Sequence, residues 1–249
     1  MPLAQSPFHL LIKPVGAACN LACSYCYYRE KAALYPGGHF RMPVEMLEEI
    51  TAAYLQTHPG PEIAFGWQGG EPLLRGLEFY QKALAFQAQH APRGMRVTNS
   101  LQTNGTLLDD AWAEFFARHH FLLGVSLDGP PPLHDHFRRD LQGQPSHDRV
   151  VRGLAALQRH KVQYNALVTV NRANAERPLE VYRHLTLLGF DYLQFIPVVE
   201  RASPASEHVT PQSVRPEQFG RFLCRIFDYW AHHDVGRIYV QLFESTLRT

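Results

Sequence analysis

Short runs of aliphatic and aromatic residues alternate with longer amphipathic stretches along most of this 249-residue chain. Runs this short and apolar are typical of buried strands, and apolar positions at helical spacing indicate helices between them. The predicted strands span Phe8–Lys13, Ile63–Gly66, Val97–Gln102, Leu122–Leu127, Tyr164–Val170 and Tyr192–Ile196. The predicted helices lie near Val44–Gln56, Leu77–Gln89, Asp109–Arg118, Asp148–Arg159 and Leu179–Leu188.

Successive strand and helix units of roughly thirty residues match the size of a βα repeat, and right-handed crossovers curl such repeats into a barrel. The predicted fold class is therefore α/β, a partial (β/α)6 TIM-like barrel over residues 1–200. Beyond Ile196 the pattern loosens, and then predicts a helix near Glu217–Trp230 and a further segment at Ile238–Arg248. We expect residues 201–249 to form a helical extension whose first helix covers the open barrel edge.

Unusual residues follow the predicted strands at their carboxyl ends, which is where parallel α/β folds gather ligands. In chain order they are a cysteine loop, Gln68–Pro72, Thr103–Thr106, Ser126–Pro130, Asn171 and Pro197–Val199. Because the carboxyl ends of parallel strands meet on one side of a sheet, the pattern predicts a single site there.

Cys19, Cys23 and Cys26 stand in the spacing C-x3-C-x2-C. Three thiolates can hold three corners of an iron–sulfur cube and leave the fourth iron open to a small molecule, whereas clusters used only for electron transfer normally take four. A structural zinc site is an alternative, with His39 as the fourth ligand. A disulfide is another, although the remaining cysteine, Cys224, is far along the chain.

Each turn residue in the predicted site has a plain alternative. Gly69 and Gly70 fit a turn that needs positive φ, or a place where a side chain would collide with a ligand while Glu71 accepts hydrogen bonds from an ammonium group. Ser126 and Asp128 fit simple turn caps.

The arginines and tyrosines near the site also have two interpretations. Arg138 and Arg139 fit a solvated surface pair, or one of them clamps a carboxylate through its planar fork. Tyr25, Tyr27 and Tyr28 bury large areas as structural aromatics, but their place within or beside the cysteine loop puts at least one next to any ligand.

Composition excludes some partners. With 24 basic and 23 acidic side chains the chain has no global field to attract nucleic acid or an anionic membrane. Its N-terminus does not read as a signal peptide, and no stretch approaches the ~20 apolar residues of a membrane span. We therefore expect no nucleic acid or membrane partner, and a cytoplasmic location where thiols stay reduced.

Taken together, the sequence resembles the radical S-adenosylmethionine (SAM) enzymes, and more narrowly the anaerobic sulfatase-maturating enzymes of the SPASM type. The resemblance covers nearly the whole chain. It rests on the cysteine loop and on Leu11–Pro14, Phe65–Pro72, Asn99–Thr106, Ser126–Pro130 and Leu193–Pro197.

The resemblance implies that Cys19, Cys23 and Cys26 bind a [4Fe-4S] cluster whose fourth iron is chelated by SAM. It implies that Gly70 and Glu71 meet the SAM ammonium group. The other positions matched to SAM are Ser126 and Arg138 at its carboxylate, and Tyr25 and Val199 beside it. Gln68 and Tyr28 match positions that face the substrate cavity.

By the same resemblance, a 5'-deoxyadenosyl radical attacks the β-carbon of a Cys or Ser in a sulfatase and leads to Cα-formylglycine, with flavodoxin or ferredoxin as electron donor. The resembled enzymes continue into a domain with two further clusters and a proton-accepting aspartate, neither of which this sequence contains. We therefore expect a truncated form that binds cluster and SAM without completing the two-electron oxidation.

Two rival functions stay open from the sequence. One is another SPASM-type peptide modifier, such as an enzyme that forms thioether links in a ribosomal peptide. The other is a non-catalytic, zinc-stabilised binding module.

Overall fold

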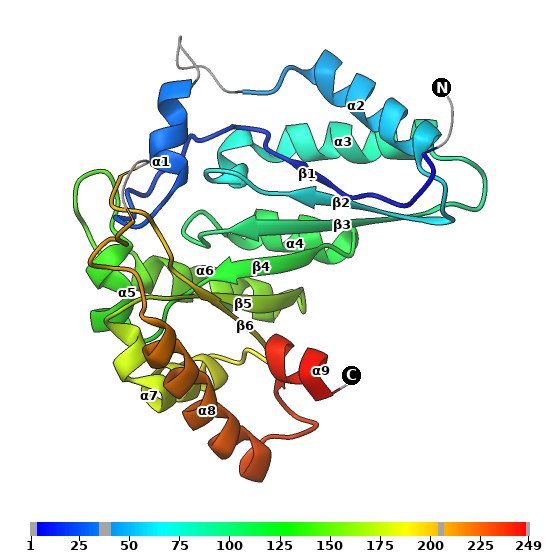
Figure 1. The fold of residues 1–249 in the computed structure, drawn as a ribbon. Coiled ribbons are helices and arrows are strands. Elements are labelled where there is room, and N and C mark those ends of the chain that lie inside the picture. Colours follow the sequence, from blue (N-terminus) through cyan, green and yellow to red (C-terminus); the bar gives the residue numbers. More distant parts are fainter. Residues whose placement is uncertain (1–3, 35–40, 204–206, 248–249) are drawn as a thin grey trace.

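The structure is a computed structural model that describes residues 4–34, 41–203 and 207–247. Its centre is a sheet in which the strands follow one another in chain order and every neighbouring pair is parallel (Figure 1). The strands are β1 (Leu10–Ile12), β2 (Glu62–Trp67), β3 (Arg96–Thr103), β4 (Leu122–Ser126), β5 (Gln163–Val170), β6 (Tyr192–Pro197) and β7 (Tyr239–Val240). Within the described part of the chain β1 and β7 do not pair with each other, so the sheet is a partial barrel.

Helices connect the strands, and the longer helices cover the outer face of the sheet (Figure 1). They are α1 (Tyr28–Lys31), α2 (Val44–Thr57), α3 (Leu77–His90), α4 (Asp110–Arg118), α5 (Pro131–Phe137), α6 (His147–Arg159), α7 (Pro178–Leu187), α8 (Pro216–His233) and α9 (Gln241–Leu247). Three short 3-10 helices lie at Ala32–Leu34, Pro72–Arg75 and Asn174–Glu176.

Alternate residues of each strand point to opposite faces, which separates the core from the site. In β2, Ile63, Phe65 and Trp67 are buried against the helices, as are Leu123 and Val125 in β4. The intervening positions face the barrel interior and are mostly small or polar. The hydrophobic core therefore lies between sheet and helices, and the interior is left for a ligand.

The fold class predicted from the sequence is confirmed, and each predicted strand is present with its ends within two residues. The prediction missed α1, α5 and β7, because short elements give too little periodicity to recognise. In α2 the buried residues are Leu47, Thr51, Tyr54 and Leu55, which form one face of the helix.

From the sequence we expect the helix after the barrel to cover its open edge. In the structure this helix, α8, lies elsewhere. Phe222, Ile226 and Trp230 of α8 are buried, and Phe222 packs edge-on against Phe195 of β6 at 5.1 Å between ring centroids. The edge position beside β6 is taken instead by β7, where Tyr239 pairs with Tyr192. Whether residues 1–200 and 201–249 are separate domains stays a prediction.

Candidate active site

The loop between β1 and α1 carries the three cysteines across the carboxyl ends of the strands (Figure 1). Cys19, Cys23 and Cys26 all line one cavity of about 470 Å³. Strands β2 to β6 each contribute residues at or just beyond their carboxyl ends, and β1 is represented by the cysteine loop that follows it. The contributed residues include Gly69 and Gly70 after β2, Asn104 after β3, Ser126 of β4, Thr169 of β5 and Val199 after β6. The structure thus brings together residues that the sequence scatters over 180 positions.

The three thiols are free in the structure, as is Cys224, which is exposed on α8. The Leu21 N–H lies 3.3 Å from Cys19 Sγ and Asn104 Nδ2 lies 3.6 Å from it, so both donate to the sulfur. Burial raises the pKa of Cys19 to about 11, and burial also raises the pKa of Cys23. The raised pKa favours the protonated thiol at Cys19 and Cys23, and metal binding converts thiols to the thiolates that ligate.

The positions of the three thiols distinguish between a single metal ion and an iron–sulfur cluster as the group that they bind. Among the described residues no three Cys, His, Asp or Glu side chains converge as a single ion requires. A zinc ion would need such convergence, and His39, its expected fourth ligand, lies outside the described residues. An iron–sulfur cluster takes each thiolate on a separate iron, so the observed donor set fits a cluster better than a single ion.

Position 70 must be glycine because the backbone of the cysteine loop packs directly against it. A Cβ at this position would lie 1.9 Å from the Ala18 carbonyl oxygen, because the Gly69–Gly70 turn packs against the start of the cysteine loop. Gly70 N–H donates to the Gly16 carbonyl and Glu71 N–H to that of Ala18, both at 2.8 Å. The cysteine loop therefore already excludes a side chain at Gly70, and a collision with a ligand there stays a prediction.

The Glu71 carboxylate faces inward. It is fully buried and accepts hydrogen bonds from Leu73 N–H at 3.0 Å, Thr103 Oγ1 at 2.8 Å and Asn104 N–H at 2.7 Å. Burial raises its pKa to about 7, although these three donors oppose the shift. Its oxygens tie the turns after β2 and β3 together, and its contact with an ammonium group stays a prediction.

Arg138 and Asp128 form a buried ion pair at the cavity wall. Arg138 Nε lies 2.9 Å from Asp128 Oδ2, and Nη2 lies 3.1 Å from Oδ1 and 2.9 Å from Thr169 Oγ1. The Tyr25 hydroxyl donates to the same carboxylate. Burial alone would raise the pKa of Asp128, but the Arg138 charge and its hydrogen bonds hold that pKa below its usual value.

Of the two arginines only Arg138 lines the cavity, and its contact with the SAM carboxylate stays a prediction. Arg139 is exposed and donates to the Gly143 carbonyl. The planar fork of Arg138 clamps a carboxylate of the protein, and only Nη1 has no hydrogen-bond partner within the described ranges. The Tyr25 ring lies beside this guanidinium, 5.5 Å from it.

The remaining predicted residues also line the cavity. Ser126, Gln68 and Tyr28 belong to its wall, and Val199 lies at the mouth with 69% of its surface exposed. Tyr28 packs on Tyr27 with ring centroids 4.3 Å apart.

Sequence reasoning missed three residues that organise the site. It placed Asp128, Thr103 and Asn104 within motifs but gave none of them a role beyond a turn. Their partners, Arg138 and Glu71, lie 10 to 33 positions away. The available signal was that each follows a predicted strand, which locates a residue but does not name its partner.

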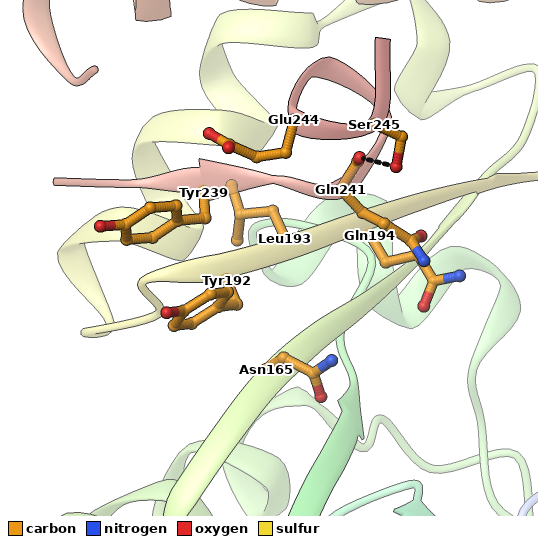
Figure 2. Close-up of a pocket in the computed structure, with 8 residues that line it drawn as sticks. All are labelled: Asn165, Tyr192, Leu193, Gln194, Tyr239, Gln241, Glu244 and Ser245. Carbon is orange, nitrogen blue, oxygen red and sulfur yellow. Dashed lines mark hydrogen bonds between the residues drawn. The ribbon is translucent and has the colours of Figure 1, made fainter. Parts of the chain in front are cut away.

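A second cavity, of about 390 Å³, lies at the amino ends of β5, β6 and β7 (Figure 2). Tyr192 and Tyr239 stack there with centroids 4.8 Å apart, and the buried Asn165 Oδ1 has no partner in the described structure. This cavity shares no lining residue with the cysteine-lined one.

A search of the described helices for one long and apolar enough to cross a membrane finds none.

The unclosed parallel barrel and its three-cysteine loop define a class of protein. Residues 14–185 match the family model of the Radical SAM superfamily, and the chain belongs to this superfamily.

The similarities extend to particular relatives. The chain is 44% identical to the serine-type anaerobic sulfatase-maturating enzyme of Bacteroides thetaiotaomicron, over 99% of this chain and 62% of that protein. It is 34% identical to the cysteine-type enzyme of Clostridium perfringens, over 98% of this chain and 66% of that protein. The solved structure of native anSMEcpe with bound AdoMet and Cp18Cys peptide superposes with a TM-score of 0.86 at 34% identity, covering 96% of this chain and 64% of that one. The chain thus spans a little under two thirds of the length of these relatives.

Proposed function

We propose that the chain is the radical-generating part of an anaerobic sulfatase-maturating enzyme, with a [4Fe-4S] cluster on Cys19, Cys23 and Cys26 and SAM in the adjoining cavity. The observation that carries this proposal is the position of three free thiols on the wall of one open cavity at the carboxyl ends of the strands. The named activities of the relatives, and the AdoMet and Cys peptide in the superposed structure, support it.

When bound, the two cofactors supply a 5'-deoxyadenosyl radical that removes hydrogen from the β-carbon of a Cys or Ser in a sulfatase peptide. The chain's part is to hold the reactants and exclude water. Arg138 Nη1 and the Ser126 hydroxyl, which lack partners in the described ranges, suit the SAM carboxylate. The Gly70 backbone suits its ammonium group.

Other cavity residues complete the proposal. Tyr25, Val199, Gln68 and Tyr28 line the same cavity. We assign Tyr25 and Val199 to contacts with SAM, and Gln68 and Tyr28 to contacts with the peptide. Glu71 fixes the turns beside the Gly70 backbone, and with Gly70 we assign it to the SAM ammonium group. The electron comes from a donor such as flavodoxin or ferredoxin.

Anaerobic reconstitution with iron and sulfide, followed by dithionite and SAM, tests the cofactor part. We expect brown cluster absorbance and 5'-deoxyadenosine from the wild-type chain. Cys23→Ala should lose both, and Cys224→Ala, which removes the exposed cysteine of α8, should retain both. A wild-type chain that takes up zinc but assembles no cluster and makes no 5'-deoxyadenosine would refute the proposal.

A sulfatase-derived peptide carrying deuterium on the β-carbon of its target Ser or Cys tests the substrate. Because this label reports only the first hydrogen transfer, it does not depend on later oxidation. Deuterium in the 5'-deoxyadenosine, measured by mass spectrometry, is expected for sulfatase maturation. Deuterium arriving only from an α-carbon, with an intramolecular crosslink in a ribosomal peptide, would indicate the thioether-forming alternative.

A further inference from the structure

His134 of α5 is fully buried and lies between the backbone of Asp128 and the side chain of Ser146, beside the Asp128–Arg138 ion pair. Its Nδ1 is 3.3 Å from the backbone nitrogen of Asp128, and its Nε2 is 3.0 Å from Ser146 Oγ. The Ser146 hydroxyl donates in turn to the backbone carbonyl of Arg138, at 2.6 Å. One imidazole and one hydroxyl thus connect the main chain at both ends of the ion pair.

The direction of these hydrogen bonds fixes the imidazole tautomer. The Asp128 N–H is a donor, so His134 Nδ1 must accept and carry no proton. The single hydroxyl proton of Ser146 goes to the Arg138 carbonyl, so its oxygen accepts from Nε2–H. Only the neutral Nε2–H form satisfies every group, and burial lowers the pKa of His134 to about 3.

The side chains of the pair depend on where this relay holds their backbones. The Asp128 carboxylate accepts hydrogen bonds from Arg138 Nε and from the Tyr25 hydroxyl. Its Oδ1 also accepts from Thr169 N–H at 2.9 Å. Arg138 and Tyr25 line the cysteine-lined cavity, while His134 and Ser146 do not. A shift of either backbone would therefore move groups at the cavity wall.

We propose that His134 is a positioning residue, which acts through Ser146 to hold Arg138 and Tyr25 in the geometry that binds SAM. This inference rests on the function proposed above. It assigns His134 no contact with SAM and no part in proton transfer.

The neighbouring histidines provide a matched control. His147 Nε2 and His184 Nε2 lie 2.9 Å apart, and the His147 ring is 5.7 Å from that of His134. His184 is partly buried in the same region, but makes no hydrogen bond to Asp128, Arg138 or Ser146 in the structure as described. His184→Gln therefore loosens local packing without breaking the relay.

The test compares His134→Phe, His134→Gln, Ser146→Ala and His184→Gln in the reconstituted chain. SAM affinity is measured by the change that SAM causes in the electron paramagnetic resonance spectrum of the reduced cluster, and iron content is measured alongside. We expect His134→Phe to raise the Kd for SAM at least tenfold and Ser146→Ala about threefold, both with normal iron. His134→Gln, whose amide can still donate to Ser146, should recover most of the affinity, and His184→Gln should stay within twofold.

A second readout needs no cofactor. In the chain labelled with 15N-histidine, His134 should show the Nε2–H tautomer and no titration above pH 5. In a separate hydrogen-exchange measurement, the amide hydrogen of Asp128 should exchange faster in Ser146→Ala than in wild type. If His134→Phe does not fold, the Ser146→Ala variant and the 15N-histidine spectrum still test the inference.

Several results would overturn the inference: an unchanged Kd in His134→Phe, an equal rise in His184→Gln, or an Nδ1–H tautomer in the wild type. If the wild type assembles its cluster but binds no SAM, the proposed function fails instead. The tautomer and the amide exchange would then still show whether the relay exists.

Discussion

The Glu71 carboxylate accepts a 2.7 Å hydrogen bond from the backbone N–H of Asn104, which joins the turn after β2 to the turn after β3. Asn104 in turn donates from its side chain to Cys19 Sγ and to Asn20 Oδ1. A buried carboxylate thus connects two strand ends with the loop that carries the thiols. The glutamate of the Gly-Gly-Glu-Pro motif therefore stabilises the structure of the site.

We predict that Glu71→Gln destabilises the fold by about 2 kcal/mol, because an amide nitrogen would replace one acceptor oxygen and face a backbone or hydroxyl donor in a buried place. Urea unfolding of the chain measures the change. Glu78→Gln, at an exposed position in the first turn of α3, is the control and should stay within about 0.5 kcal/mol. Equal effects of the two substitutions would contradict the assigned role.

Asp128→Asn should cost about 3 kcal/mol or more, because it leaves the buried Arg138 charge without its counterion. The comparison is Glu114→Gln, which breaks the Arg118–Glu114 pair of α4, whose side chains are 68% and 59% exposed. Exposed pairs of this kind contribute about 0.5 kcal/mol. Chemical denaturation of both variants checks the contrast, and a mild effect of Asp128→Asn would argue against a buried, paired charge.

Gly70→Ala should displace the cysteine loop, since its Cβ would lie 1.9 Å from the Ala18 carbonyl oxygen, a backbone atom. We expect the iron bound after reconstitution to fall at least twofold. Gly220→Ala on α8 is the matched substitution, because a Cβ there meets nothing within 4 Å and alanine favours a helix. Full iron content in Gly70→Ala would show that the loop tolerates the shift.

The burial of His134 predicts a loss of stability in acid. Its pKa is lowered from 6.5 to about 3, so between these values the unfolded chain binds a proton that the folded chain does not. Stability from this group is complete above pH 6.5 and declines as pH falls toward 3. Asp128, Arg138, His147 and His184 face the ring, and among these the Asp128 charge opposes the shift.

Between pH 7.5 and pH 5 the His134 contribution should fall by about 2 kcal/mol, at 1.36 kcal/mol per pKa unit. Urea unfolding at the two pH values measures it. In His134→Gln the difference between the two pH values should shrink by a similar amount, because glutamine does not titrate. An unchanged pH dependence in that variant would assign the acid loss to other groups.

The strands, most helices and the end of the barrel that carries the site were predictable because they depend on local periodicity and on residues that follow a strand. The spacing of Cys19, Cys23 and Cys26 indicated a metal loop for the same reason, since all three belong to one short segment. The strand β7 was not predicted because a segment of two residues is too short to show a hydrophobic periodicity.

Through-space partners were decided only by the tertiary structure. The sequence placed Glu71, Arg138 and Gly70 at the site, but not the groups each one meets, which are Asn104, Asp128 and the Ala18 carbonyl. A hydrogen bond or a close approach depends on how separate strands stack in the sheet, which no single segment encodes. For this chain, local pattern set where the chemistry lies, and the packing of the barrel set which side chains remain free to perform it.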